Sequence, residues 1–179
     1  MNRETGQVLA VNISEKRGIK KHNINEAYIR SDWGIEVDAH SGDWHRQVSL
    51  LSLSSVEKMR ALGAVIDYGD FAENLTVAGI DVAVLPIGTH LQIGEVQMEV
   101  TQIGKECHNK ACAIKKQVGT CVMPTEGIFA KALTSGWVRT GDNVEVIEDK
   151  YIYLTFPMGI VYICLKVSAW KASKKGVLS

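Results

Sequence analysis

The sequence lacks an excess of charge of either sign, because 20 basic residues balance 20 acidic residues and the isoelectric point is near 7.0. This balance gives no indication of nucleic acid or of a membrane surface as a partner. Residues 1–6 are polar, and no apolar segment typical of a signal peptide follows them. We therefore expect a cytoplasmic protein whose four cysteines are mostly reduced thiols.

Proline is also scarce, with 3 residues against 16 glycines in a chain of 179. Many glycines between short apolar runs are typical of tight turns that connect short strands. Helical patterns cover only residues 54–62, where Ser54 and Glu57 have capping-box spacing, and residues 124–133. We therefore expect a mainly β fold, a barrel or a sandwich, with two or three short helices and with strands near residues 8–13, 26–30, 46–52, 91–93, 95–101 and 143–147.

One apolar run approaches the length of a membrane span. Residues 151–167 carry no charge until Lys166, but a spanning helix needs about 18–20 apolar residues. Pro157 and Gly159 interrupt the run. The lysines after it favour a cytosolic C-terminus, which would place the N-terminal domain outside without a signal. We expect a domain over residues 1–148 and a tail over residues 149–179 that forms a hairpin packed on it, with self-association as a further possibility.

Three of the four cysteines lie within residues 103–121. Cys107 follows the end of an expected strand, and Lys105, His108 and Lys110 flank it. Positive neighbours favour the thiolate, which is the nucleophilic form and a soft metal ligand. Cys107 is therefore our first candidate for a reactive residue, although a half-buried, inert cysteine is the structural alternative.

A zinc or iron site is the less favoured interpretation of this segment. Its spacing, C-H-x3-C-x8-C, lacks the paired C-x2-4-C units of most zinc sites. An iron–sulfur cluster would need four thiolates, with Cys164 as the fourth. Cys112 and Cys121 could also pack locally or act as resolving thiols for Cys107. These alternatives stay open.

Four strings, in order, resemble the signatures of MOSC domains, the C-terminal modules of molybdenum-cofactor sulfurases. The likeness extends over about residues 6–148 and is closest to small stand-alone bacterial members. Val37 departs from it, because the family usually has glycine there. If that glycine needs a positive φ, the turn in this chain must differ. The strings are GIEVDAHSG (34–42) with WHRQVSLL (44–51), FAENLT (71–76) with Gly79, LPIG (85–88), and VTQIGKEC (100–107).

The resemblance implies a fold built round a β-barrel and a role in handling molybdenum cofactor or sulfur. Cys107 would either accept sulfane sulfur as a persulfide or ligate molybdenum. The lysines near it could form an anion site for the pterin phosphate or simply a solvated face, while Arg46 offers a planar fork that suits phosphate. The residues that we expect to bind cofactor are His40, Arg46, Asn74, Lys105 and His108.

The same resemblance suggests partners. A chain of 179 residues has no room for a cysteine desulfurase beside this fold, so any sulfur would come from a separate desulfurase. Pyridoxal phosphate would belong to that partner, and a molybdoenzyme could receive the product. One alternative is a minimal molybdenum-dependent reductase of N-hydroxylated bases, served by an external redox partner. A zinc-stabilised interaction module is the other, so the sequence leaves open whether the protein is an enzyme.

Overall fold

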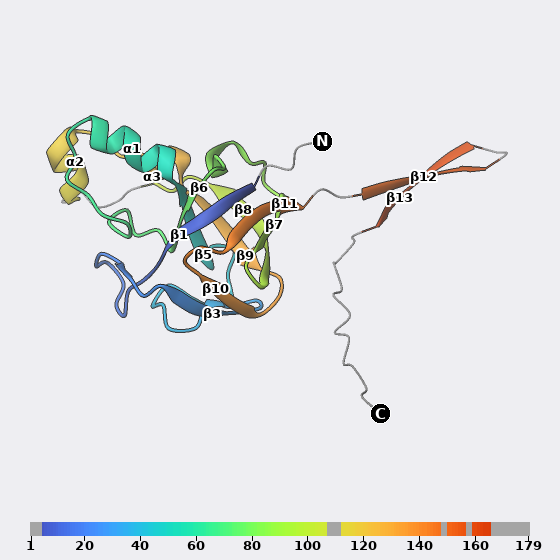
Figure 1. Cartoon of the computed structure of the whole chain (residues 1–179), viewed down its shortest axis with the longest axis horizontal. Coiled ribbons are helices and arrows are strands. Elements are labelled where there is room, and N and C mark those ends of the chain that lie inside the picture. Colours follow the sequence, from blue (N-terminus) through green and yellow to red (C-terminus); the bar gives the residue numbers. More distant parts are fainter. Residues whose placement is uncertain (1–4, 107–111, 148–149, 157–158, 166–179) are drawn as a thin grey trace, which may run out of the picture. The chain divides into compact units, whose positions relative to one another are not determined.

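A computed structural model describes residues 5–106, 112–147, 150–156 and 159–165, the last two ranges as backbone strands. The chain divides into two compact units, Met1–Ile147 and Glu148–Ser179. Figure 1 shows the elements of each unit, and each is described by itself.

The first unit is a closed barrel of seven strands. Their order is β11-β7-β8-β9-β5-β6-β1, and β1 pairs with β11 to complete the circle. Among the pairings of described strands, β5 with β6 alone is parallel. The strands are β1 (Thr5–Ile13), β5 (Val48–Ser52), β6 (Leu75–Ala78), β7 (His90–Ile93), β8 (Val96–Ile103), β9 (Ile128–Ala132) and β11 (Asn143–Ile147). The mainly β, barrel-based fold expected from the sequence is confirmed.

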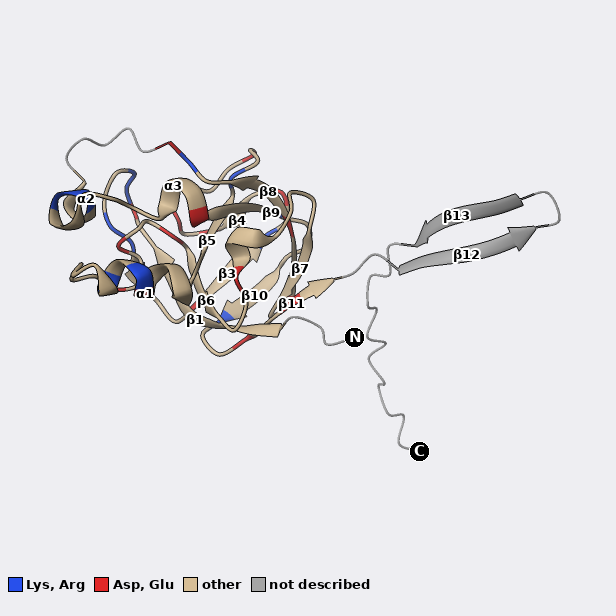
Figure 2. Cartoon of the chain, turned by 90° about the horizontal axis from the view of Figure 1, so that it is seen from above, with Lys and Arg blue, Asp and Glu red and all other residues tan. Residues whose placement is uncertain are grey.

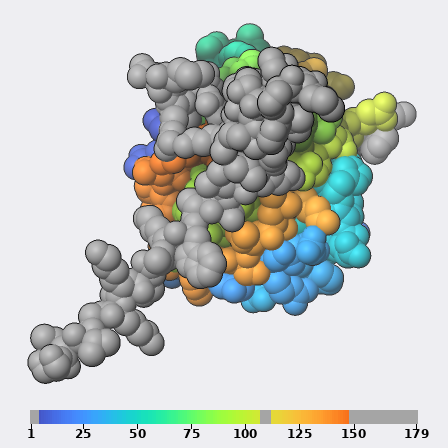
Figure 3. All heavy atoms as spheres, turned by 90° about the vertical axis from the view of Figure 1, so that its right-hand side faces the viewer, coloured from blue at the N-terminus to red at the C-terminus, as the bar shows by residue number. Residues whose placement is uncertain are grey.

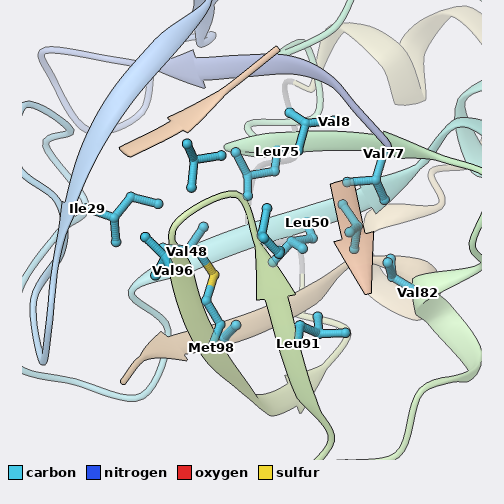
Figure 4. Close-up of a cluster of buried hydrophobic side chains, with 14 of the residues drawn as sticks. Val8, Ile29, Val48, Leu50, Leu75, Val77, Val82, Leu91, Val96 and Met98 are labelled. Atoms are coloured by element: carbon cyan, nitrogen blue, oxygen red, sulfur yellow. The ribbon is translucent and has the colours of Figure 1, made fainter. Parts of the chain in front are cut away.

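The barrel interior is filled by aliphatic side chains from every wall (Figure 4). The strand expected over residues 95–101 forms β8, and its alternate residues Val96, Met98 and Val100 are fully buried. In a strand, successive side chains point to opposite faces, so alternation places one set in the core. Leu50 and Leu75, opposite each other on the parallel pair, are fully buried in the same cluster.

A second apolar cluster lies beneath the helices, which gather at one end of the unit (Figure 1). The helices are α1 (Leu53–Ala61), α2 (Ala113–Val118) and α3 (Met123–Glu126), with a 3-10 turn, η1 (Val82–Val84). Val56 and Met59 of α1 pack in this cluster with Phe71 and with Ile114 of α2. The barrel wall and the helices therefore enclose a second core, which supports the loops around it.

A smaller sheet of three strands contains β10 (Gly136–Arg139), β3 (Glu26–Arg30) and β4 (Gly34–Ile35). Tyr28 of β3 lies opposite Trp137 of β10, with their ring centroids 5.6 Å apart. The space-filling view shows the blue residues of the β3 region beside the orange residues of the β10 region on this face (Figure 3). A two-residue strand, β2 (His22–Asn23), extends the barrel sheet beside β1.

Two local expectations were wrong. Helix α1 begins after Ser52, which makes no side-chain cap, so the expected capping box at Ser54 is not used. The helix expected over residues 124–133 ends at Glu126, because Gly127 is extended and the next residues form β9. This strand pairs with both β5 and β8, and those long-range hydrogen bonds override the local helical pattern.

The second unit contains an antiparallel pair, β12 (Lys150–Phe156) and β13 (Gly159–Leu165), with Tyr153 opposite Tyr162. Its strands follow the hairpin that the sequence indicates, whereas its packing on the first domain stays a prediction. Within the residues that the structure describes, no helix has the length and apolar character needed to cross a membrane.

Replacing Leu50 with Ala should lower the free energy of unfolding by about 2–5 kcal/mol, because the change leaves a cavity in the barrel core. Chemical denaturation followed by circular dichroism would measure the loss. Leu62→Ala is the matched control, since Leu62 is 58% exposed and its variant should stay within about 0.5 kcal/mol of wild type. Equal losses in the two variants would contradict the described core.

Candidate functional site

A cavity of about 420 Å³ opens beside α2. It is lined by His40 and by parts of five other stretches of chain, at residues 18–20, 70–72, 105–106, 112–114 and 121–124. His40 and Lys105, two of the residues expected to bind cofactor, therefore share one cavity. Cys112 and Cys121 line it as well, which places the two described cysteines of the thiol-rich segment at the same site.

A buried carboxylate, Asp38, lies behind His40. Its Oδ2 accepts hydrogen bonds from Lys21 Nζ at 2.7 Å, from the Ser14 backbone N–H at 3.1 Å and from Asn74 Nδ2 at 3.2 Å. Its Oδ1 accepts from the His40 backbone N–H at 2.8 Å and lies 3.2 Å from His40 Nδ1. The side chains of Asp38 and Lys21 are only 1% and 2% exposed. Both carboxylate oxygens are thus fully engaged away from solvent.

The contacts of Asp38 and Lys21 determine the charge state of both groups beneath the cavity. Burial alone would raise the pKa of Asp38, but the hydrogen bonds from His40 and the charge of Lys21 hold it well below its usual range. Burial lowers the pKa of Lys21, and the nearby carboxylate of Asp38 opposes that shift. Lys105 and Glu73 also act on Lys21 through their charges, which shows that these groups are electrostatically close. Asp38 is therefore a fixed anion with its cation in contact.

Asn74 supports this carboxylate from the barrel wall and is 2% exposed. Its Nδ2 donates to Asp38 and to the Asn12 carbonyl oxygen at 3.0 Å, and its Oδ1 accepts from the Ser49 N–H at 3.1 Å. The side chain therefore connects β1, β5 and the Asp38 loop. Asn74 thus hydrogen-bonds to Asp38 behind the cavity. The sequence predicts instead that Asn74 contacts the cofactor directly.

Glu73 holds the cavity loop at residues 69–72. Its fully buried carboxyl accepts hydrogen bonds from the Gly69 N–H at 2.6 Å, the Phe71 N–H at 3.2 Å and Thr76 Oγ1 at 3.0 Å. Burial raises the pKa of this carboxyl, and the hydrogen bonds oppose that shift. Gly69 has φ of +93°, and a Cβ there would lie 2.5 Å from the Lys21 carbonyl oxygen. The loop thus depends on glycine and on Glu73 together.

Arg46 is not among the described residues that line the cavity, but it stacks on Trp44, which hydrogen-bonds to the lining residue His40. Its guanidinium carbon is 4.7 Å from the ring centre of Trp44 and 5.8 Å from that of Phe129. Its Nε is buried and has no partner among the described residues. Trp44 in turn donates from Nε1 to the His40 carbonyl oxygen at 3.0 Å. A cationic group with an unused donor is therefore held next to the His40 loop.

Cys107, His108 and Lys110 lie outside the described residues. The residues that flank this stretch, Glu106 and Cys112, both line the cavity. Lys115 and Lys116 are exposed on α2 (Figure 2). No group of three or more His, Cys, Asp or Glu among the residues described could hold a metal ion. The zinc interpretation, which needs Cys107 and His108, stays untested.

Sequence reasoning missed Lys21. It belongs to what reads as a basic surface turn at residues 16–21, but its side chain is buried against Asp38 while its neighbour Lys20 is exposed and pairs with Asp70. Nothing in the local pattern separates the two lysines, because the burial of Lys21 comes from contacts with residues far away in the chain. The Asp38–His40 spacing was the signal that could be read locally.

The model of the MOSC domain matches residues 37–145, and the chain belongs to the MOSC family, which is linked to molybdenum-cofactor-related proteins. Solved structures with the same fold include YuaD from Bacillus subtilis, at 17% identity and a TM-score of 0.68, covering 81% of this chain and 97% of that one. YiiM from Geobacillus stearothermophilus matches at 17% identity and a TM-score of 0.61, and the match covers 80% of this chain and 76% of that one. YiiM from Escherichia coli matches at 15% identity and a TM-score of 0.53, and the match covers 83% of this chain and 70% of that one. No curated protein gives a significant match.

The departure at Val37 is accommodated without strain. Asn25, Asp32 and Ala72 are the non-glycine residues with positive φ in the described part of the chain, so Val37 has ordinary backbone geometry. Its side chain is 60% exposed, beside the buried Asp38. The turn therefore presents Asp38 inward without needing glycine at position 37.

Removing the Lys21 ammonium should destabilise the fold, because the buried Asp38 carboxylate would lose its counter-ion. We expect Lys21→Met to lower the free energy of unfolding by about 3–5 kcal/mol, and the double variant with Asp38→Asn to lose less than the sum of the single changes. The matched control is Lys131→Met, because Lys131 also lies 2.7 Å from a carboxylate, Asp32, but on the surface. Its stability should match wild type. Additive effects at positions 21 and 38 would contradict the coupling.

Acid should weaken the fold through Asp38. Its pKa is lower in the folded chain than in the unfolded chain, so the stability it contributes is present above about pH 4 and is lost as pH falls toward the folded value. Denaturation curves between pH 3 and pH 7 should show a shallower acid slope in Asp38→Asn. Glu73, whose pKa is raised, acts in the opposite sense and is retained in both proteins. Identical slopes would count against this assignment.

Proposed function

We propose that this protein binds molybdenum cofactor, or carries sulfur for it, in the cytoplasm and through the Cys107 thiolate. The supporting observation is the shared cavity, which joins His40 and Lys105 to both residues that flank the stretch 107–111. Its volume of about 420 Å³ falls within the range of small-molecule sites. Any ligand in this cavity lies next to Glu106 and Cys112, the residues on either side of the segment that carries Cys107.

The groups around the cavity fit an anionic ligand with a soft metal. Lys20 and Lys105 line it, and Arg46 nearby has a buried Nε without a partner among the described residues. Cations of this kind suit phosphate and the charged pterin. Cys112 and Cys121 add soft sulfur atoms to the walls. In this proposal His40, Arg46, Lys105 and His108 hold the cofactor, Asn74 supports them through Asp38, and the bound cofactor supplies redox chemistry.

The carrier form of this role needs a donor protein. The Cys107 thiolate would attack the outer sulfur of a persulfide on a cysteine desulfurase, so that the sulfur moves to Cys107 and the donor cysteine leaves as a thiolate. Pyridoxal phosphate chemistry belongs to that partner. A molybdoenzyme would then receive the sulfur or the cofactor.

A second candidate function is a minimal molybdenum-dependent reductase of N-hydroxylated bases. The Asp38–His40 pair favours it, because a pocket imidazole held by a buried carboxylate is suited to proton transfer. A pure carrier has less need of such a group. Electrons for this reaction would come from an external redox partner.

Replacing Cys107 with Ser should abolish molybdenum retention or persulfide loading, because serine offers neither a soft ligand nor a sulfur nucleophile. Metal analysis and pterin fluorescence after anaerobic purification would measure the first, and intact-mass analysis after incubation with a desulfurase the second. Cys164→Ser, in the second unit, is the control and should match wild type. Retention of both properties in Cys107→Ser would remove Cys107 from the mechanism.

A further inference from the structure

The imidazole of His40 is held on one side and open on the other. Its Nδ1 lies 3.2 Å from Asp38 Oδ1, the same oxygen that accepts the His40 backbone N–H at 2.8 Å. The side chain is 27% exposed and lines the cavity. Its Nε2 has no partner among the described residues, so this nitrogen is available to whatever the cavity binds.

The environment of Asp38 decides which ring nitrogen carries hydrogen. An ionised carboxylate accepts hydrogen bonds and donates none, so the Nδ1 of His40 must be the donor. Asp38 cannot readily take the proton itself, because Lys21, the Ser14 N–H and Asn74 all donate to its other oxygen. In agreement, the pKa of Asp38 lies well below its usual range. Neutral His40 therefore presents a basic Nε2, and the protonated ring presents an acidic one.

We propose that His40 is the proton-exchanging residue of the cavity, acting through Nε2, with Asp38 as the residue that orients it. This inference rests on the proposed function in taking the cavity as the ligand site, and its kinetic test rests on the reductase form of that function. The other charged groups that line the cavity are Lys20, which pairs with Asp70, and the neighbours Lys105 and Glu106. Lys20 is already paired, and both lysines are exposed, whereas the imidazole of His40 is oriented by Asp38 and lines the cavity.

The reduction of an N-hydroxylated base shows where this proton is needed. The N–O bond breaks, two electrons enter from a reduced external donor, and two protons convert the products to an amine and water. The departing oxygen leaves more easily when it is protonated as the bond breaks. Nε2–H of the protonated His40 supplies that proton, and solvent at the cavity mouth restores it.

Nitrogen NMR of protein labelled with 15N-histidine tests the orientation without any activity. We expect neutral His40 to carry its hydrogen on Nδ1. His22 is the internal reference, because it is exposed and its Nε2, not its Nδ1, lies 3.6 Å from a carboxylate, that of Glu15. A neutral His40 with hydrogen predominantly on Nε2 would overturn the proposal, whether or not the protein holds molybdenum.

Two amide variants separate proton exchange from simpler roles. His40→Asn can keep a donor to Asp38 in place of Nδ1–H, and His40→Gln can keep a donor near the position of Nε2, but neither exchanges protons. In protein purified with its cofactor, with an N-hydroxylated purine as substrate and reduced viologen as electron donor, we expect kcat to fall about 100-fold or more in both. KM should change less in His40→Gln.

The contrary outcomes are distinct. Wild-type kcat in His40→Asn would show a structural role, and wild-type kcat in His40→Gln would show hydrogen bonding alone, so either result overturns the proposal. Absence of molybdenum and pterin from the wild-type protein would instead defeat the proposed function, and the tautomer measurement would still decide the orientation of His40. Thermal denaturation of both variants would show that the losses do not come from unfolding.

Discussion

The pairing of β1 with two other barrel strands, β11 and β6, is the constraint on which the rest of the structure depends. Its first residues pair with β11 and close the barrel, while its later residues pair with β6. The register shifts between Val8 and Ala10, so that Val8 and Val11 both face the core although they are three residues apart. A β-bulge reverses which residues face inward. After the bulge Val11 and Ile13 face the core, and the backbone of the next residues meets the Asp38 cluster, because the Ser14 N–H donates to Asp38 and the Asn12 carbonyl oxygen accepts from Asn74.

The Asp38 cluster is costly to form and specific once formed. Burying a carboxylate and an ammonium removes each from water, and their attraction offsets that loss only when the remaining hydrogen bonds are satisfied. Here the Ser14 N–H, Asn74 and His40 complete the set around Asp38 and Lys21. These donors come from the residue after β1, from the residue before β6 and from the turn that contains Asp38. The cluster thus joins three parts of the chain in one arrangement that sets the position of His40.

The sequence predicts the barrel better than the site, for a physical reason. Alternation over residues 95–101 reports burial on one face of a strand, and that strand is β8. The pattern over residues 124–133 misleads, because β9 is specified by its pairing with β5 and β8 and not by local preference. The roles of Lys21 and Asn74 are harder still to predict from the sequence. Their partners lie 17 and 36 residues away at Asp38, and no local spacing encodes those contacts. His40 was predicted from the resemblance to MOSC domains, and its contact with Asp38, two residues away, is the part of the cluster that is local in the sequence.

The cavity is lined by six separate stretches of the chain, and none of these lining residues belongs to a barrel strand. Several of these stretches are short loops, and Glu73 fastens one of them to the barrel. A ligand that fills the cavity would therefore act as a non-covalent cross-link between these stretches. Binding to the folded chain alone adds stability in proportion to the logarithm of ligand concentration. A bound ligand would therefore also restrict the motion of these stretches relative to one another.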